Sequence, residues 1–173
     1  MQNGTVLAVD NLKLSTKLNQ LNAHYNSLAA LSKEMLKKYT SYVEDCLEYQ
    51  QNYTAAEQWL IKANEQLVTC QKSVNDKYGI QAQLDILNKL VITQGQGQVL
   101  VQSAANWADK SMTNSSTEGR ERVRQEMHSL HDSWDTFLST LTETRSNLEN
   151  SLLSWGEFNE NLEQMQNWLK DAE

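Results

Sequence analysis

The fold is decided by residues 14–70, which read LSTKLNQLNAHYNSLAALSKEMLKKYTSYVEDCLEYQQNYTAAEQWLIKANEQLVTC. Apolar side chains recur here in alternating steps of four and three, from Leu14 to Cys70, and only Ser32 interrupts them. Residues three and four apart share one helix face, and the stretch holds no Pro and no Gly, so the pattern predicts one very long helix. At about 1.5 Å per residue this helix approaches 85 Å, which is longer than a compact domain of this size needs.

A second helical pattern starts near Ile80 and is interrupted in its middle. Gln94 and Gln98 fall on its apolar stripe, and Gly95 and Gly97 lie beside them. Each Gly costs about 1 kcal/mol relative to Ala inside a helix. This interruption predicts a kink or a break in the second helix.

A third long helix is predicted after the polar loop 113–117. Ser116 is the expected N-cap, and Glu118 in the first turn suits the positive end of the helix dipole. Its apolar stripe starts at Val123 and continues to Ala172. The polar cluster at residues 72–79 and the loop 113–117 therefore predict the two turns of a chain that folds back twice.

The composition narrows the class of function. Pro is absent, and the chain carries 15 basic and 22 acidic residues, a net charge of −7. Nucleic-acid binding requires clustered positive charge, so no DNA or RNA partner is expected. No apolar run approaches the length of a membrane span. The charge is also uneven, because residues 10–39 carry five basic and two acidic groups whereas residues 149–173 carry one basic and six acidic groups. This gradient favours head-to-tail neighbours, or it reflects ordinary solvated helix faces.

The two cysteines indicate a reducing compartment. Cys46 and Cys70 fall on one stripe of one predicted helix, at a separation of about 36 Å given 1.5 Å per residue. A disulfide needs Cα atoms within about 7 Å, so these two cannot pair. Both are expected to be buried free thiols, which predicts a cytoplasmic location.

No catalytic or metal constellation is evident. His128, His131, Asp132 and Asp135 have helical spacings that could gather ligands, but Leu130 and its neighbours assign the core to another face. No Ser/His/Asp or Cys/His arrangement occurs. The chain is expected not to be an enzyme and to hold no cofactor.

The chain repeats itself after 109 residues without a gap. The shift aligns the two long predicted helices, so the sequence predicts a linear array of copies. The aligned pairs are Leu21 with Leu130, Tyr25 with Trp134, Leu28 with Phe137, Glu48 with Glu157, Tyr49 with Phe158, Asn52 with Asn161, Trp59 with Trp168, Leu60 with Leu169, and Ala63 with Ala172.

These residues resemble the spectrin repeat. Trp59-Leu60 and Trp168-Leu169 resemble the first-helix Trp of that repeat, and residues 116–120 resemble the start of its third helix. Further matches in the third helix are Glu126, Leu130, Trp134, Asp135, Arg145, Leu148 and Glu149. The resemblance implies an all-α fold, an elongated array of left-handed three-helix bundles joined by continuous inter-repeat helices.

The resemblance also implies a domain organisation. Residues 1–9 are a disordered N-terminal edge, 10–42 the third helix of a preceding repeat, 43–151 a complete repeat, and 152–173 the first helix of the next. The expected core residues are Tyr25, Trp59, Leu60, Leu130, Trp134, Phe137, Trp168 and Leu169. Tyr25 replaces the usual Trp, and the second helix is less regular than in spectrin. These departures resemble the nesprins, the giant spectrin-repeat proteins of the nuclear envelope.

The function implied by the resemblance is structural. Such arrays are semi-rigid spacers and docking surfaces that link a membrane or organelle to actin, and in nesprins the outer nuclear membrane to the cytoskeleton within the LINC complex. Cytoskeletal protein partners are expected, for example an actin-associated regulator such as a formin. Trp107 and the basic cluster Lys33, Lys37 and Lys38 are partner-binding candidates, although the lysines equally suit a solvated face.

Two other readings remain open. One is a homodimeric coiled coil, which predicts no turns near residues 72–79 and 112–117. The other is a helical module that binds a specific cytoskeletal regulator. The stripe of residues 10–42 lacks its own bundle partners, so this segment either frays or associates with another copy or a bound protein.

Overall fold

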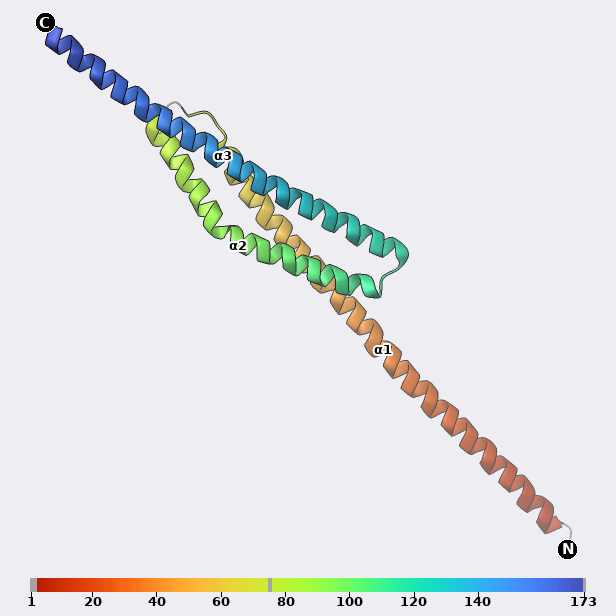
Figure 1. Ribbon diagram of the computed structural model, residues 1–173. Coiled ribbons are helices and arrows are strands. Elements are labelled where there is room, and N and C mark those ends of the chain that lie inside the picture. Colours follow the sequence, from red (N-terminus) through yellow and green to blue (C-terminus); the bar gives the residue numbers. More distant parts are fainter. Residues whose placement is uncertain (1–2, 75, 173) are drawn as a thin grey trace. The chain divides into compact units, whose positions relative to one another are not determined.

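The computed structural model describes residues 3–74 and 76–172, which form three α-helices. Helix α1 spans Asn3–Cys70, α2 spans Lys77–Thr113 and α3 spans Thr117–Ala172 (Figure 1). No strand occurs in these two stretches of the chain. The predicted all-α class is confirmed, and the two turns that a plain coiled coil would lack are both present.

The chain divides into two compact units, one up to Asp45 and the other from Cys46 onward. Helix α1 contributes residues to both units, whereas α2 and α3 belong to the second. The predicted repeat start at residue 43 falls near this division. The repeat limits at residues 43 and 151 stay predictions.

The second unit is a three-helix bundle with one continuous apolar core. All three helices contribute to this core, and the aliphatic and aromatic stripes meet along its axis. Its buried members are Tyr49, Ala56, Leu60, Ala63, Leu67 and Cys70 from α1, Leu87, Leu90, Val101, Ala104 and Ala108 from α2, and Val123, Met127, Leu130, Trp134, Phe137 and Leu141 from α3. Full burial of one such large side chain stabilises the fold by about 1.5–3 kcal/mol.

An aromatic cluster joins α1 to α3 in the middle of the bundle. The ring centroid of Trp59 lies 5.7 Å from that of Trp134 and 5.6 Å from that of Phe137. The Trp59–Phe137 pair is edge-to-face, a geometry that aromatic quadrupoles favour. Phe137 and Trp134 are buried, and Trp59 is partly buried against the core. These three residues hold the two long helices in register.

Helix α2 is bent rather than broken. It continues through Gly95 and Gly97, and Figure 1 shows a bend near its middle. Thr93 Oγ1 donates to the carbonyl oxygens of Lys89 and Leu90, both at 3.2 Å, and such back-bonding accompanies helix bending. The predicted interruption is therefore a kink within a continuous helix.

The stripe predicted for α2 is out of register in its middle. Val91 and Gln98, which were expected on the apolar face, are exposed, whereas Leu90 and Gly97 are buried. The reason is Gly97, which lies against Trp59: a Cβ added at Gly97 would lie 2.5 Å from Trp59 Cζ3. Only Gly permits this close approach of α2 to the Trp59 ring.

The two turns are fixed by side-chain caps. Ser116 Oγ accepts a hydrogen bond from the Gly119 amide at 3.1 Å, which confirms Ser116 as the N-cap of α3. Asp76 caps α2 in the same manner, accepting from the Gly79 amide at 2.7 Å. Helix α2 therefore starts at Lys77, earlier than the predicted start near Ile80.

The segments flanking the bundle differ from two expectations. The N-terminal edge is helical from Asn3 onward, because residues 3–9 carry no residue that forbids continuation of α1; residues 1 and 2 lie outside the described residues. Tyr25, Trp168 and Leu169 were expected in a core, yet they are 69%, 67% and 54% exposed. In the part of the chain that the structure describes, no helix packs on their faces.

The cysteines also differ from each other. Cys70 is buried, and its thiol donates to the carbonyl oxygen of Gln83 at 3.6 Å. Burial raises the pKa of the Cys70 thiol, which keeps it protonated. Cys46 was expected to be buried but is exposed, because it lies at the edge of the second unit where the bundle core begins only at Tyr49.

Candidate interaction surfaces

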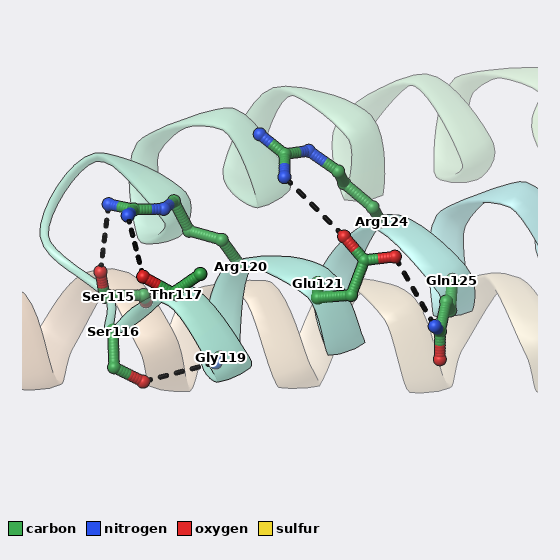
Figure 2. A network of polar contacts seen from close by, with 8 residues as sticks. All are labelled: Ser115, Ser116, Thr117, Gly119, Arg120, Glu121, Arg124 and Gln125. Carbon is green, nitrogen blue, oxygen red and sulfur yellow. Dashed lines mark hydrogen bonds and ion pairs between the residues drawn. The ribbon is translucent and has the colours of Figure 1, made fainter.

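A polar network fastens the turn between α2 and α3 (Figure 2). Arg120 Nη1 donates to the carbonyl oxygen of Ser115 at 3.1 Å, and Nη2 donates to Thr117 Oγ1 at 3.4 Å. Together with the Ser116 cap, the guanidinium ties the loop to the first turn of α3. This arrangement closes one end of the bundle with side chains of the loop itself.

The next turn of α3 carries an exposed charge pair. Arg124 Nη1 lies 3.6 Å from Glu121 Oε2, and Gln125 Nε2 donates to Glu121 Oε1 at 3.3 Å (Figure 2). Both charged side chains are more than half exposed. Such pairs contribute little to stability, so these side chains stay available at the surface.

A single interhelical hydrogen bond joins α1 to α3 beside this end. Tyr49 Oη donates to Glu126 Oε2 at 2.7 Å, and Arg122 Nε lies 3.7 Å from Glu126 Oε1. Burial, and then the bond to Glu126, raises the pKa of Tyr49 above its ordinary 10.0. The phenol therefore stays neutral and works as a donor. The sequence did not predict this bond, since Glu126 was assigned only by resemblance.

The other end of the bundle is held by Gln83. Its Nε2 donates to the Lys72 carbonyl oxygen at 2.9 Å, and its Oε1 is buried with no partner among the described residues. Gln71 Nε2 donates to Thr144 Oγ1 at 3.4 Å, which ties the end of α1 to α3. A surface hollow here is lined by residues of all three helices and by Trp155, where α3 leaves the bundle.

Trp107, a predicted partner-binding residue, is not a free aromatic anchor. It is partly buried against the core, and Lys110 Nζ lies 3.8 Å from the centroid of its ring. A cation at this distance is attracted by the ring face and covers it. This geometry does not favour Trp107 as a contact residue.

The predicted basic cluster is exposed. Lys33, Lys37 and Lys38 all lie on the solvent side of α1 in the first unit. Lys38 Nζ lies 5.6 Å from the ring centroid of Tyr42, and its hydrogen bond to that phenol is the main cause that raises the pKa of Lys38. The cluster is fully charged at neutral pH and available to an acidic partner.

Two exposed apolar stripes are the most prominent surface features. The first lies on α1 in the first unit, and the second lies on the last part of α3 in the second unit. The first contains Leu14, Leu18, Leu21, Tyr25, Leu28, Met35 and Tyr39, and the second contains Phe158, Leu162, Met165, Trp168 and Leu169, each between 43% and 69% exposed. Contiguous apolar surface of this kind marks an interaction site.

Neither a metal cluster nor a membrane-crossing helix is found in residues 3–74 and 76–172. No three His, Cys, Asp or Glu side chains gather there as a cation would need. His128 pairs with Asp132 at 3.5 Å, whereas His131 Nδ1 lies 2.7 Å from the Met127 carbonyl oxygen on its own helix. None of the three described helices has an apolar stretch long enough to cross a lipid bilayer.

The geometry defines a class of protein. A three-helix bundle whose first and last helices continue past its ends, built on a 109-residue self-similarity, has the spectrin-repeat fold. Its prominent features are surfaces for protein contact.

Comparison with known proteins agrees with this class. The chain is 27% identical over 160 residues to Muscle-specific protein 300 kDa of Drosophila melanogaster. It is 21% identical over 162 residues to microtubule-actin cross-linking factor 1 (isoforms 6/7) of Mus musculus, and 22% identical over 157 residues to the human form. These matches cover 92%, 93% and 90% of this chain but only 1%, 5% and 4% of the relatives. No protein-family model matches the chain.

Proposed function

We propose that this chain is a structural segment of a cytoskeletal rod, a semi-rigid spacer that holds attached elements at a set separation. The observation that carries this proposal is the continuity of α1 and α3 past the bundle, because a helix shared by successive bundles transmits orientation and resists bending. The likeness to a microtubule-actin cross-linking factor supports a cytoskeletal setting.

A stretching experiment tests the spacer. The chain is held between two handles in magnetic tweezers and loaded slowly. A spacer keeps its length at low force, loses the bundle in one cooperative step, and refolds when the load falls. The variant Phe137→Ala, which removes a buried ring, serves as the control and should yield at lower force. Gradual lengthening from the lowest force would contradict the proposal.

We further propose that the rod is anchored at the cytoplasmic face of the outer nuclear membrane and linked to actin, as in the nesprins. The support is the set of residues that resemble this group, above all Tyr25 in place of Trp and the irregular second helix. Imaging of the full-length protein tests the location. A ring around the nucleus supports it, and an exclusively peripheral pattern contradicts it.

A docking role is a second candidate, and the exposed basic cluster favours it. Lys33, Lys37 and Lys38 would contact an acidic surface of an actin-associated regulator such as a formin. Binding of a purified formin to the immobilised chain is compared with binding to the triple Lys→Glu variant at these positions. Lys62→Glu, at an exposed position on the bundle, is the control. Loss of binding only in the triple variant supports docking here, and equal binding excludes it.

A further inference from the structure

The internal repeat and the bundle together assign an occupant to the exposed stripes. In the bundle, Trp59 of α1 packs on Trp134 and Phe137 of α3. The 109-residue shift maps Trp59 onto Trp168, Trp134 onto Tyr25, and Phe137 onto Leu28. The second stripe therefore carries the first-helix half of a packing interface, and the first stripe carries the third-helix half.

The same mapping gives a register for the pair. Tyr49, which bonds to Glu126, maps onto Phe158, and Glu126 maps onto Lys17. The mapped contact replaces a phenol–carboxylate bond by a Lys beside an aromatic ring, a pairing that is also attractive. Each contact observed in the bundle thus has a chemically compatible counterpart between the two stripes.

The charges are complementary as well. Residues 10–39 carry five basic and two acidic groups, and residues 149–173 carry one basic and six acidic groups. Opposite net charge on the two segments steers their encounter and disfavours the pairing of either segment with itself. This argument separates a head-to-tail contact from a symmetric dimer through residues 10–42.

We propose that a second copy of this chain covers these stripes, with residues 152–172 of one copy packing in parallel on residues 10–30 of the next, so that Trp168 contacts Tyr25 and Leu28. The contact joins two different surfaces, so it leaves a free stripe at each end and builds open linear chains. It lacks a counterpart of α2, and it is therefore weaker than the bundle.

Complementation of two full-length variants tests the proposal. Trp168→Ser disables the second stripe and Tyr25→Ser the first; both residues are about two-thirds exposed, so the bundle should keep its thermal stability. Ile92→Ser and Val99→Ser, at exposed positions on α2, are the matched controls. The readout is the mass distribution by sedimentation over a concentration series at low and high salt.

The expected result has three parts. The unmodified chain and the α2 controls form concentration-dependent oligomers that weaken in high salt. Each stripe variant alone associates at least about tenfold more weakly, as removal of a central aromatic contact predicts. An equimolar mixture of the two stripe variants restores one interface and stops at a 1:1 dimer.

Three results would overturn the proposal. The first is a unmodified chain that stays monomeric throughout the series. The second is loss of association in Tyr25→Ser but not in Trp168→Ser, which would indicate a symmetric dimer of the first stripe. The third is a mixture of the two variants that stays monomeric.

Discussion

The bundle and its flanking segments carry the same pattern of residues but use it differently. Trp134 and Phe137 are 8% and 1% exposed, whereas their repeat counterparts Tyr25 and Leu28 are 69% and 67% exposed. The pattern of a helix face therefore states which residues are able to form a core. Burial depends on whether another helix lies against that face.

The largest expected effect is the loss of a buried ring. Phe137→Ala should destabilise the bundle by about 3–5 kcal/mol, because it removes a fully buried side chain and leaves a cavity. The counterpart change Leu28→Ala should alter the free energy of unfolding by less than about 0.5 kcal/mol, as for other exposed positions. Urea unfolding of dilute protein measures both. Similar losses from the two changes would contradict the difference in burial.

The two glycines of α2 give the next comparison. Gly97→Ala should cost about 1–3 kcal/mol by overpacking, because the new methyl group would overlap the Trp59 ring. Gly95→Ala meets no atom within 4 Å and should stabilise α2 by about 0.5–1 kcal/mol through its higher helix propensity. Thermal unfolding of the two variants tests this opposite sign. A gain at Gly97 would show that Trp59 does not pack there.

A smaller effect is expected at Tyr49. Tyr49→Phe removes the hydrogen bond to Glu126 and should cost about 1–2 kcal/mol, since a bond to a charged group is stronger than average but Glu126 is partly exposed. The chain itself has Phe158 at the counterpart position.

The same variant has a pH signature. The folded state raises the pKa of Tyr49, so the unfolded chain loses this proton first. The resulting stabilisation is complete below about pH 10, the ordinary value for Tyr, and is lost as the pH rises above it. Tyr53, whose pKa burial also raises, retains its own share in both proteins. Unfolding measured from pH 8 to 11 should therefore show a shallower decline for Tyr49→Phe than for the unmodified chain.

The sequence predicted most of the fold because its strongest signal is periodic. The long helices, both turns and the Ser116 cap followed from apolar spacing and cap chemistry, which are local properties. The register of α2 did not follow, because Gly97 has no side chain that would mark it as a core position. Its spacing from Leu90 and Val101, seven and four residues away, is the signal that would have revealed it.

The surfaces were harder to predict than the core. Trp107 stood out by residue type, but its partial burial and its cover by Lys110 depend on packing among three helices. The bond between Tyr49 and Glu126 joins residues 77 positions apart and has no local signature. The basic cluster was predicted correctly as exposed because charged side chains on a helix opposite an apolar stripe have no other place to lie.

The central claim is that α3 leaves the bundle as one uninterrupted helix, and a distance between spin labels tests it most directly. Labels at Ser129→Cys and Asn159→Cys, with Cys46→Ser and the buried Cys70 retained, are compared with a pair inside the bundle at Glu118→Cys and Asn147→Cys. At about 1.5 Å per residue, the account predicts a narrow distribution centred near 45 Å for the first pair and near 44 Å for the second. A first pair that is much broader or markedly shorter than the second would contradict the claim.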